Sequence, residues 1–253
     1  MDIHVDLVPD LRAASRARPD DADASIVIDV LRSATVTALL FERGARSVTL
    51  TSGLRAARSL AQASSALLIG ERGGFPPEGF NHGGSPSALR SIRIDDRDVV
   101  LLATESPAAL AAARGTTWLA GLTNAVAVVD AVVARSPASV RVICAGDTGA
   151  PDLSDTIAAG LLIAMLDRAI RETHGTDVTL TGAATFCLGV LRTTKDPLDG
   201  IWASSFGAVL RSVGLEEDLA IASAVASSAV APRVVSLEEM HGKPVARVVQ
   251  HAS

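Results

Sequence analysis

The segment DVLRSAT at positions 29–35 combines a carboxylate, a guanidinium and two hydroxyl groups within seven residues. It follows the apolar run SIVI, so Asp29 stands at the end of an expected buried strand, where ligands of open α/β sheets collect. A carboxylate there can hold a cation, and Arg32 can bind two oxygens of an anion. The free N–H groups of the following helix start, near Ser33 and Thr35, also favour phosphate. The structural alternative is that Ser33 or Thr35 caps the helix and Asp29 pairs with Arg32.

A glycine-rich segment at positions 70–87, GERGGFPPEGFNHGGSPS, is the second candidate. It has no hydrophobic period, and a structureless stretch of this length inside a compact domain is usually functional. Glu71 and Arg72 supply both charge signs, and the glycines, among them Gly73, let backbone amides approach a ligand closely. Ser85 followed by proline is typical of a helix start. The alternative is an ordinary glycine-rich surface loop.

The third candidate, CAGDTG at positions 144–149, closes another apolar run, and Asp155 follows in the first turn of a long helical segment. Cys144 is either a nucleophile or a small buried apolar residue. Asp155 is either a metal ligand or a carboxylate that offsets the helix dipole. Histidines and cysteines lack zinc-site spacing, whereas carboxylates at strand ends suit Mg²⁺, which takes few protein oxygens and keeps its waters.

Short apolar runs alternate with amphipathic ones, and these elements must position the candidate residues. The expected strands are 25–31, 46–50, 66–70, 98–104, 116–121, 139–146, 231–237 and 244–250. The expected helices are 35–45, 53–63, 106–114, 123–135 and 153–173, with a mainly helical region after about residue 175. The alternation predicts an α/β fold with a mostly parallel sheet and helices on both faces. The ends of strands 25–31, 66–70 and 139–146 are expected to converge on one pocket.

Length and composition limit the class of protein. The 253 residues are 48% hydrophobic, which excludes a disordered chain, and favour one domain, 1–253, or two closely packed lobes of about 1–121 and 122–253. The net charge of −5 gives no basic surface for nucleic acid, and no uncharged stretch is long enough to span a membrane. Two cysteines and the lack of a signal peptide predict a reduced cytoplasmic protein.

The order of the motifs is more specific than any one of them. IDVLRSAT, GERGG…EGFNHGGSP, LTNAVAV, ICAG…SD and EED together resemble the 2-phosphosulfolactate phosphatase (ComB) family, from about Ile26 to Asp218. The resemblance implies that family's unusual α/β arrangement and an Mg²⁺-dependent phosphatase. It also implies a small phosphate ester, 2-phospho-3-sulfolactate, as the substrate, on the way to coenzyme M or sulfolactate.

The matched positions receive roles from their side-chain chemistry. Asp29 and Asp155 are expected to hold Mg²⁺, and Glu71 is expected to act as a third ligand or as the general base. Cys144 is kept as an alternative nucleophile. The residues expected to bind the substrate's phosphate or sulfonate are Arg32, Ser33, Thr35, Arg72, Gly73, Ser85 and Asn124.

Three departures from the family pattern fall at the expected site. Gly84 replaces an asparagine, ATESP at positions 103–107 replaces TTNGT, and Ser154 replaces a glutamate. We therefore expect Mg²⁺ binding with weak activity on 2-phosphosulfolactate itself, so a related small anionic phosphate ester is also considered as the substrate. The alternative is a non-catalytic homologue that binds a small anion and has lost turnover. No nucleic-acid or membrane partner is expected, and a homo-oligomer is left open.

Overall fold

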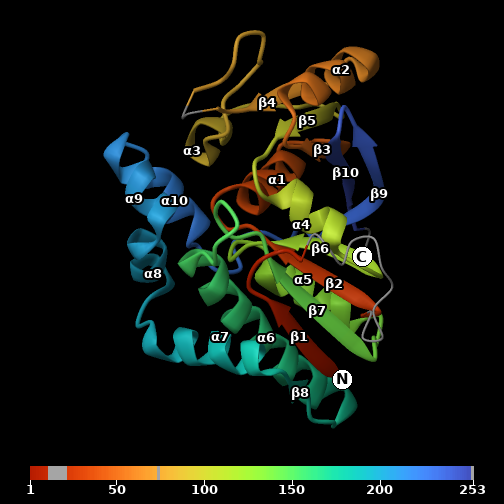
Figure 1. Ribbon diagram of the computed structural model, residues 1–253, viewed down its shortest axis with the longest axis vertical. Helices are drawn as coiled ribbons and strands as arrows, with labels where there is room; N and C mark the ends of the chain where they lie inside the picture. Colours follow the sequence, from red (N-terminus) through yellow and green to blue (C-terminus); the bar gives the residue numbers. More distant parts are fainter. Residues whose placement is uncertain (11–21, 73–74, 252–253) are drawn as a thin grey trace.

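Ten strands form one continuous sheet in the computed structural model, which describes residues 1–10, 22–72 and 75–251 (Figure 1). In sheet order the strands are β4 (Leu67–Gly70), β5 (Asp98–Leu102), β3 (Ser47–Thr51), β10 (Lys243–Gln250), β9 (Pro232–Met240), β6 (Thr116–Ala120), β2 (Ala24–Ile28), β7 (Ser139–Cys144), β1 (Asp2–Asp6) and β8 (Thr179–Leu180). Most neighbouring strands run parallel, which confirms the predicted α/β class.

The sheet consists of two parallel groups joined by an antiparallel hairpin. Strands β4, β5 and β3 form one group, and β6, β2, β7, β1 and β8 form the other. Between them, β10 pairs antiparallel with β3 and with β9, and β9 reaches β6 through the pair Trp118–Arg233. Strands from both sides of residue 121 therefore mix in one sheet, and the division of the chain into lobes stays a prediction.

Helices pack on both faces of this sheet, as the alternating pattern predicted. They are α1 (Ser33–Glu42), α2 (Leu54–Ser64), α3 (Pro86–Leu89), α4 (Ser106–Ala112), α5 (Ala125–Val133), α6 (Leu153–His174), α7 (Gly182–Thr193), α8 (Pro197–Ala203), α9 (Ser205–Ser212) and α10 (Glu216–Ala222). Each expected strand and helix lies within a few residues of an observed one. The region after residue 175 is mainly helical, as expected.

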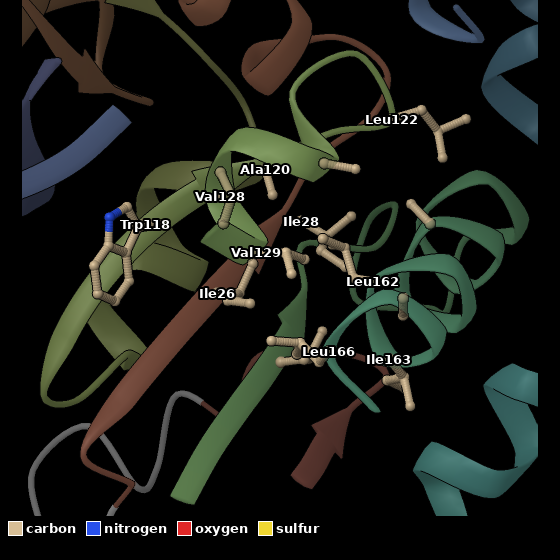
Figure 2. Close-up of a cluster of buried hydrophobic side chains, with 14 of the residues drawn as sticks. Ile26, Ile28, Trp118, Ala120, Leu122, Val128, Val129, Leu162, Ile163 and Leu166 are labelled. Carbon is tan, nitrogen blue, oxygen red and sulfur yellow. The ribbon is translucent and has the colours of Figure 1, made fainter. Parts of the chain in front are cut away.

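The buried strand β2 shows why both faces are covered. Successive strand side chains point to opposite faces, so Ile26 and Ile28 join the core beneath α5 and α6, whereas Val27 joins the core beneath α1 and α4. Figure 2 shows the first of these clusters, in which Ile26 and Ile28 lie between β6 and the side chains of α5 and α6. Every residue of β2 is buried, which explains its unbroken apolar sequence.

The C-terminal helices form a separate stack beside the sheet (Figure 1). Helix α8 packs against α6 and α9, and α10 packs against α9 and the short helix α3. Since α3 follows the glycine-rich segment, this stack brings the C-terminal part of the chain next to that segment. In the described part of the chain, no helix combines the length and apolar character needed to cross a membrane.

A close contact between α6 and α7 depends on Gly160. A Cβ atom at this position would lie 2.4 Å from the carbonyl oxygen of Cys187 and 2.9 Å from the Cβ atom of Leu191. Because a backbone carbonyl cannot rotate away, we expect Gly160→Ala to push the two helices apart. The expected loss in the free energy of unfolding is about 1–3 kcal/mol, measured by urea denaturation.

Gly189 provides the matched control on α7. A Cβ atom there would meet no heavy atom within 4 Å. Gly189→Ala should therefore raise the free energy of unfolding by up to about 1 kcal/mol, through helix propensity alone. Equal effects of the two substitutions would contradict the proposed role of the α6–α7 contact.

Candidate active site

A cavity of about 200 Å³ lies where strand ends of both parallel groups converge. Its lining includes residues that directly follow β2, β4, β5 and β7, together with the N-terminal residues of α1 and α6. The lining residues are Asp29, Leu31, Arg32, Ser33, Val36, Glu71, Gly84, Leu101, Leu102, Ala103, Thr104, Glu105, Gly146, Asp147, Thr148, Asp152, Ser154, Asp155 and Phe206. The expected convergence of strands 25–31, 66–70 and 139–146 on one pocket is confirmed.

The charges that line this cavity are strongly unbalanced. Six of its residues carry carboxylates, whereas one, Arg32, carries a positive charge. The carboxylates belong to Asp29, Glu71, Glu105, Asp147, Asp152 and Asp155. A phosphate dianion would be repelled by such a lining unless a bound cation offset part of the negative charge.

The side chain of Asp155 binds the backbone just after β2 and just after β7, two neighbouring strands. Its Oδ1 accepts a hydrogen bond of 2.9 Å from the N–H of Val30, and its Oδ2 accepts one of 3.0 Å from the N–H of Gly146. The side chain is buried, and this burial raises its pKa well above the ordinary value of 3.8. The negative charge of Asp29 raises the pKa further, while the two N–H donors oppose the shift.

Two other aspartates lie at helix starts beside Asp155. The Oδ1 of Asp29 accepts the N–H of Ser33, the first residue of α1, at 3.2 Å. Burial raises the pKa of Asp29, and the hydrogen bonds from Ser33 oppose that shift. Asp152 caps α6 by accepting the N–H of Ser154 at 2.8 Å and the N–H of Asp155 at 3.3 Å. Three carboxylates are thus held by backbone donors around the same cavity.

Arg32 is held between two carboxylates of distant segments. Its Nη1 lies 2.5 Å from the Oδ2 of Asp218, and its Nη2 contacts the Oε1 of Glu71. The guanidinium carbon also lies 5.7 Å from the centre of the Phe206 ring. The side chain is almost completely buried, and this burial lowers its pKa, which the charge of Asp218 raises. The guanidinium therefore faces the cavity in a fixed orientation.

Glu71 reaches this contact from the end of β4. Gly70 precedes it with a φ of +138°, and a Cβ atom on Gly70 would lie 2.7 Å from the carbonyl oxygen of Leu102. An L-residue with a side chain fits neither this backbone conformation nor this space. Gly70 therefore lets the chain leave β4 close to β5 and turn Glu71 toward Arg32.

Asp218 belongs to the matched EED motif, but no role was predicted for it from the sequence. It is fully buried, and besides Arg32 it accepts the hydroxyl of Ser85 at 2.7 Å and the N–H of Ser87 at 3.0 Å. In the sequence it belongs to the acidic run EED at the start of α10, a pattern that usually offsets the helix dipole. The matched EED motif was the one signal that could have identified it.

Several expected substrate-binding residues hold the backbone instead of lining the cavity. Thr35 donates its hydroxyl to the carbonyl oxygen of Val30 at 2.9 Å. The Ser85 hydroxyl is used by Asp218 and caps α3, as its position before a proline predicted. The amide of Asn124 donates to the carbonyl oxygens of Leu119 and Val230 and accepts the N–H of Gly121. Ser33, in contrast, lines the cavity.

The remaining candidates lie at different places. Arg72 is exposed and lines a neighbouring cavity, and Gly73 falls outside the described residues. Cys144 is fully buried, and its thiol lies 3.7 Å from the carbonyl oxygen of Asp155, outside the cavity lining. Burial raises the pKa of this thiol well above its ordinary value. This placement favours the core role of Cys144 over the nucleophilic one.

The three departures from the family pattern all border the same cavity. Gly84, Glu105 and Ser154 each line it, together with Ala103 and Thr104 of the changed segment. Burial raises the pKa of Glu105, and the N–H of Thr148 opposes this shift. Glu105 and Ser154, where the sequence predicted an added and a lost carboxylate, therefore belong to one site.

The carboxylates fit a cation that needs few protein ligands. Across the residues that the structure describes, no three or more His, Cys, Asp or Glu side chains form a ready metal-binding group. Arg32 uses the Oε1 of Glu71, whereas Asp29 and Asp155 make no ion pair with Arg32, line the same cavity and each retain oxygen lone pairs. Mg²⁺ is commonly held by one or two carboxylates, several waters and substrate phosphate. The pair Asp29 and Asp155 fits this mode.

Comparison with known proteins supplies the remaining observation. A sequence profile described as 2-phosphosulpholactate phosphatase matches residues 9–236. The chain is 32% identical to the "Probable 2-phosphosulfolactate phosphatase" of Deinococcus radiodurans, over 93% of this chain and 94% of that protein. It is also 32% identical to the protein of the same name from Thermus thermophilus, over 92% and 94% of the two chains. A third similar protein of that name, from a Synechococcus strain, is 33% identical over 84% and 89%.

The buried pair of Arg32 and Asp218 leads to a stability prediction. Asp218→Ala leaves a buried guanidinium with one partner fewer and removes an acceptor from Ser85 and Ser87. We expect the free energy of unfolding to fall by about 3–5 kcal/mol, the usual effect of removing one partner of a buried ion pair. Urea denaturation of the purified variant measures it.

Glu217→Ala is the control for this prediction, in the same turn of α10. Glu217 is exposed and lies 3.6 Å from the equally exposed Arg90. Because solvent screens such a pair, the free energy of unfolding should change by less than about 0.5 kcal/mol. A comparable loss in both variants would show that the burial of Asp218 has no special effect.

The raised pKa of Asp29 leads to a prediction about pH. A carboxyl group whose pKa is higher in the folded than in the unfolded state contributes stability below its unfolded pKa of 3.8, and that contribution is lost as the pH rises through the folded pKa. Asp29→Asn removes this titration. The stability of the variant relative to the unchanged protein should therefore increase as the pH rises above 3.8.

Urea denaturation at several pH values, with EDTA present so that no cation binds, measures this difference. Asp130→Asn, which removes an exposed carboxylate from α5, controls for the loss of one negative charge. A stability difference for Asp29→Asn that does not change with pH would contradict the prediction.

Proposed function

Because the chain belongs to the 2-phosphosulfolactate phosphatase family, we propose that it hydrolyses the phosphate ester of a small anionic molecule, 2-phospho-3-sulfolactate or a close relative. The observation that carries this proposal is the orientation of Arg32. Its guanidinium is buried, fixed by Asp218 and Glu71, and faces a cavity at the N-terminus of α1. Such a group binds phosphate oxygens in a defined geometry.

Charge balance supports a requirement for Mg²⁺. The cavity carries six carboxylates against one guanidinium, so a dianionic ester needs a further positive charge. Asp29 and Asp155 are the proposed ligands, and Mg²⁺ held there would neutralise the phosphate oxygens and make phosphorus more electrophilic. Their raised pKa values have the same origin, since both carboxylates are buried beside negative charges.

Different residues of the chain have different roles in the proposed reaction. Of the five N–H groups of a guanidinium, the contacts of Arg32 with Asp218 and Glu71 use two, so three remain for phosphate oxygens. The first turn of α1, beginning at Ser33, places its positive dipole end at the same cavity. Glu71 is the proposed general base. A water that gives it a proton attacks phosphorus and the ester P–O bond breaks. The departing oxygen takes up a proton from solvent, so that the alcohol and inorganic phosphate leave, and Glu71 then loses its proton to solvent.

The cellular setting is part of the same proposal. The two cysteines of the described chain are free and buried, which fits the reducing cytoplasm. Removal of phosphate from 2-phospho-3-sulfolactate would yield sulfolactate, on the way to coenzyme M or to sulfolactate itself. The departures at Gly84, at 103–105 within the changed segment 103–107, and at Ser154 line the cavity and favour weaker turnover of 2-phosphosulfolactate than of a related ester.

Phosphate release from a panel of small phosphate monoesters, including 2-phosphosulfolactate, tests the proposed function. The purified protein is assayed with Mg²⁺ and again with excess EDTA. We expect release from at least one anionic ester, lost with EDTA and restored by Mg²⁺. If no ester is hydrolysed with any divalent cation while inorganic phosphate still binds, the chain is instead a small-anion-binding homologue without turnover.

Substitution of Arg32 tests its role in the reaction. Arg32→Lys keeps the positive charge but loses the planar group that contacts Asp218, Glu71 and the phosphate together. We expect kcat/KM to fall at least tenfold, about 1.4 kcal/mol of transition-state stabilisation. Arg55→Lys, at an exposed position on α2, should leave kcat/KM unchanged. A folded Arg32→Lys protein with unchanged kinetics would reduce Arg32 to a structural role.

A further inference from the structure

A second and larger cavity, of about 400 Å³, adjoins the first. Six residues line both cavities: Arg32, Glu71, Leu102, Ala103, Thr104 and Phe206. The ion pair of Arg32 and Glu71 is thus shared by the two spaces. A ligand that contacts Arg32 from the first cavity can therefore extend into the second, which alone has the volume of a typical small-molecule site.

The two cavities differ sharply in the chemistry of their linings. Seven of the twelve residues around the second cavity are apolar, and they come mainly from α9 and the turn after it. Among the polar residues, Arg32 and Glu71 neutralise each other, and Arg72 is exposed at the surface. Of the six carboxylates around the first cavity, one, Glu71, also lines the second, and its charge is paired with Arg32. The second cavity therefore favours an apolar occupant.

Helix α9 and the residue after it line the second cavity with exposed apolar side chains. Val209 and Val213 lie one turn apart and are 51% and 57% exposed, although both line the cavity. Leu210, on the neighbouring face, is buried in the core. An apolar group between α9 and the end of β5 would cover both valines, and removing such surface from water is favourable by an amount that grows with each methylene group.

We infer that the second cavity is a binding site for an apolar substituent of the phosphate ester whose phosphate group occupies the first. The inference rests on the proposed function, because it takes the phosphate position at Arg32 from it. The substrate class is then a phosphate monoester that carries a short alkyl chain or a single ring next to the ester oxygen, in place of the carboxylate and sulfonate of 2-phospho-3-sulfolactate. The side chains of α9 contact the apolar substituent in the second cavity, and the first cavity binds the phosphate group.

A series of non-hydrolysable alkylphosphonates tests the inference by binding alone. Methyl-, ethyl-, propyl- and butylphosphonate are titrated into the full chain with Mg²⁺ present, by calorimetry. We expect affinity to rise about two- to fourfold for each added methylene, since each buried CH₂ is worth about 0.8 kcal/mol at most here. A flat series, or no measurable binding by any member, overturns the inference.

A polar substitution at Val209 tests whether the rise in affinity with alkyl length arises in the second cavity. In the unchanged protein, butylphosphonate should bind about tenfold or more tightly than methylphosphonate. Val209→Asn should reduce this ratio toward one, because the amide must lose its hydration when the alkyl chain enters. Val126→Asn changes a valine on α5 that is 42% exposed and lines neither cavity, and it should keep the full ratio. Equal ratios in the two variants would overturn the inference.

Hydrolysis of the matching alkyl phosphates separates this inference from the proposed function. If no ester is hydrolysed but affinity still rises with alkyl length, the proposed function fails and the apolar site stands. If methyl and butyl phosphate are hydrolysed with equal kcat/KM and their phosphonates bind equally, the function stands and the apolar site is refuted.

Discussion

The contact between Arg32 and Asp218 is the interaction on which the site depends most. Removing a guanidinium or a carboxylate from water costs roughly several kcal/mol in lost hydration, unless the group is paired and hydrogen-bonded. Here Asp218 is fully buried and binds Arg32, Ser85 and Ser87 at once. These residues are up to 186 positions apart in the chain. The turn after β2, the start of α3 and the start of α10 are therefore fixed by one charged cluster, and none can move without exposing an unpaired charge.

A second constraint follows from the carboxylates around the cavity. Asp29, Asp152 and Asp155 accept N–H groups at helix starts and strand ends, so backbone dipoles offset part of their charge. The offset is incomplete, because burial still raises the pKa of Asp29 and Asp155. The fold thus maintains a region of negative potential that is unfavourable by itself. The same region becomes favourable when a cation binds, which links the stability of this part of the sheet to the chemistry proposed for it.

The sequence predicted local features well and distant ones poorly. Strands such as β2 are buried on both faces, and their unbroken apolar runs identify them without reference to other segments. The convergence of Asp29, Glu71 and Asp155 followed from the strand ends before Asp29 and Glu71 and from the helix start that holds Asp155. In contrast, Asp218 and Asn124 act through partners far away in the chain, and no local pattern distinguishes them from a dipole carboxylate or a helix cap. The place of the β9–β10 hairpin inside the sheet depends on pairing with β3 and β6, which also lies beyond local pattern.

The site is divided between loops that follow strands of the sheet and the C-terminal helices. Loops that follow β2, β4, β5 and β7 supply the carboxylates and Arg32, whereas α9 and α10 supply Phe206, Val209 and Asp218. The charged groups of these loops follow strands whose register fixes the loop positions, as groups that contact reacting atoms require. The apolar wall sits on short helices that pack mainly on one another and on α3 and α6. Changes in α9 can therefore alter which ester fits while leaving the sheet-borne groups in place, provided that Asp218 still holds Arg32.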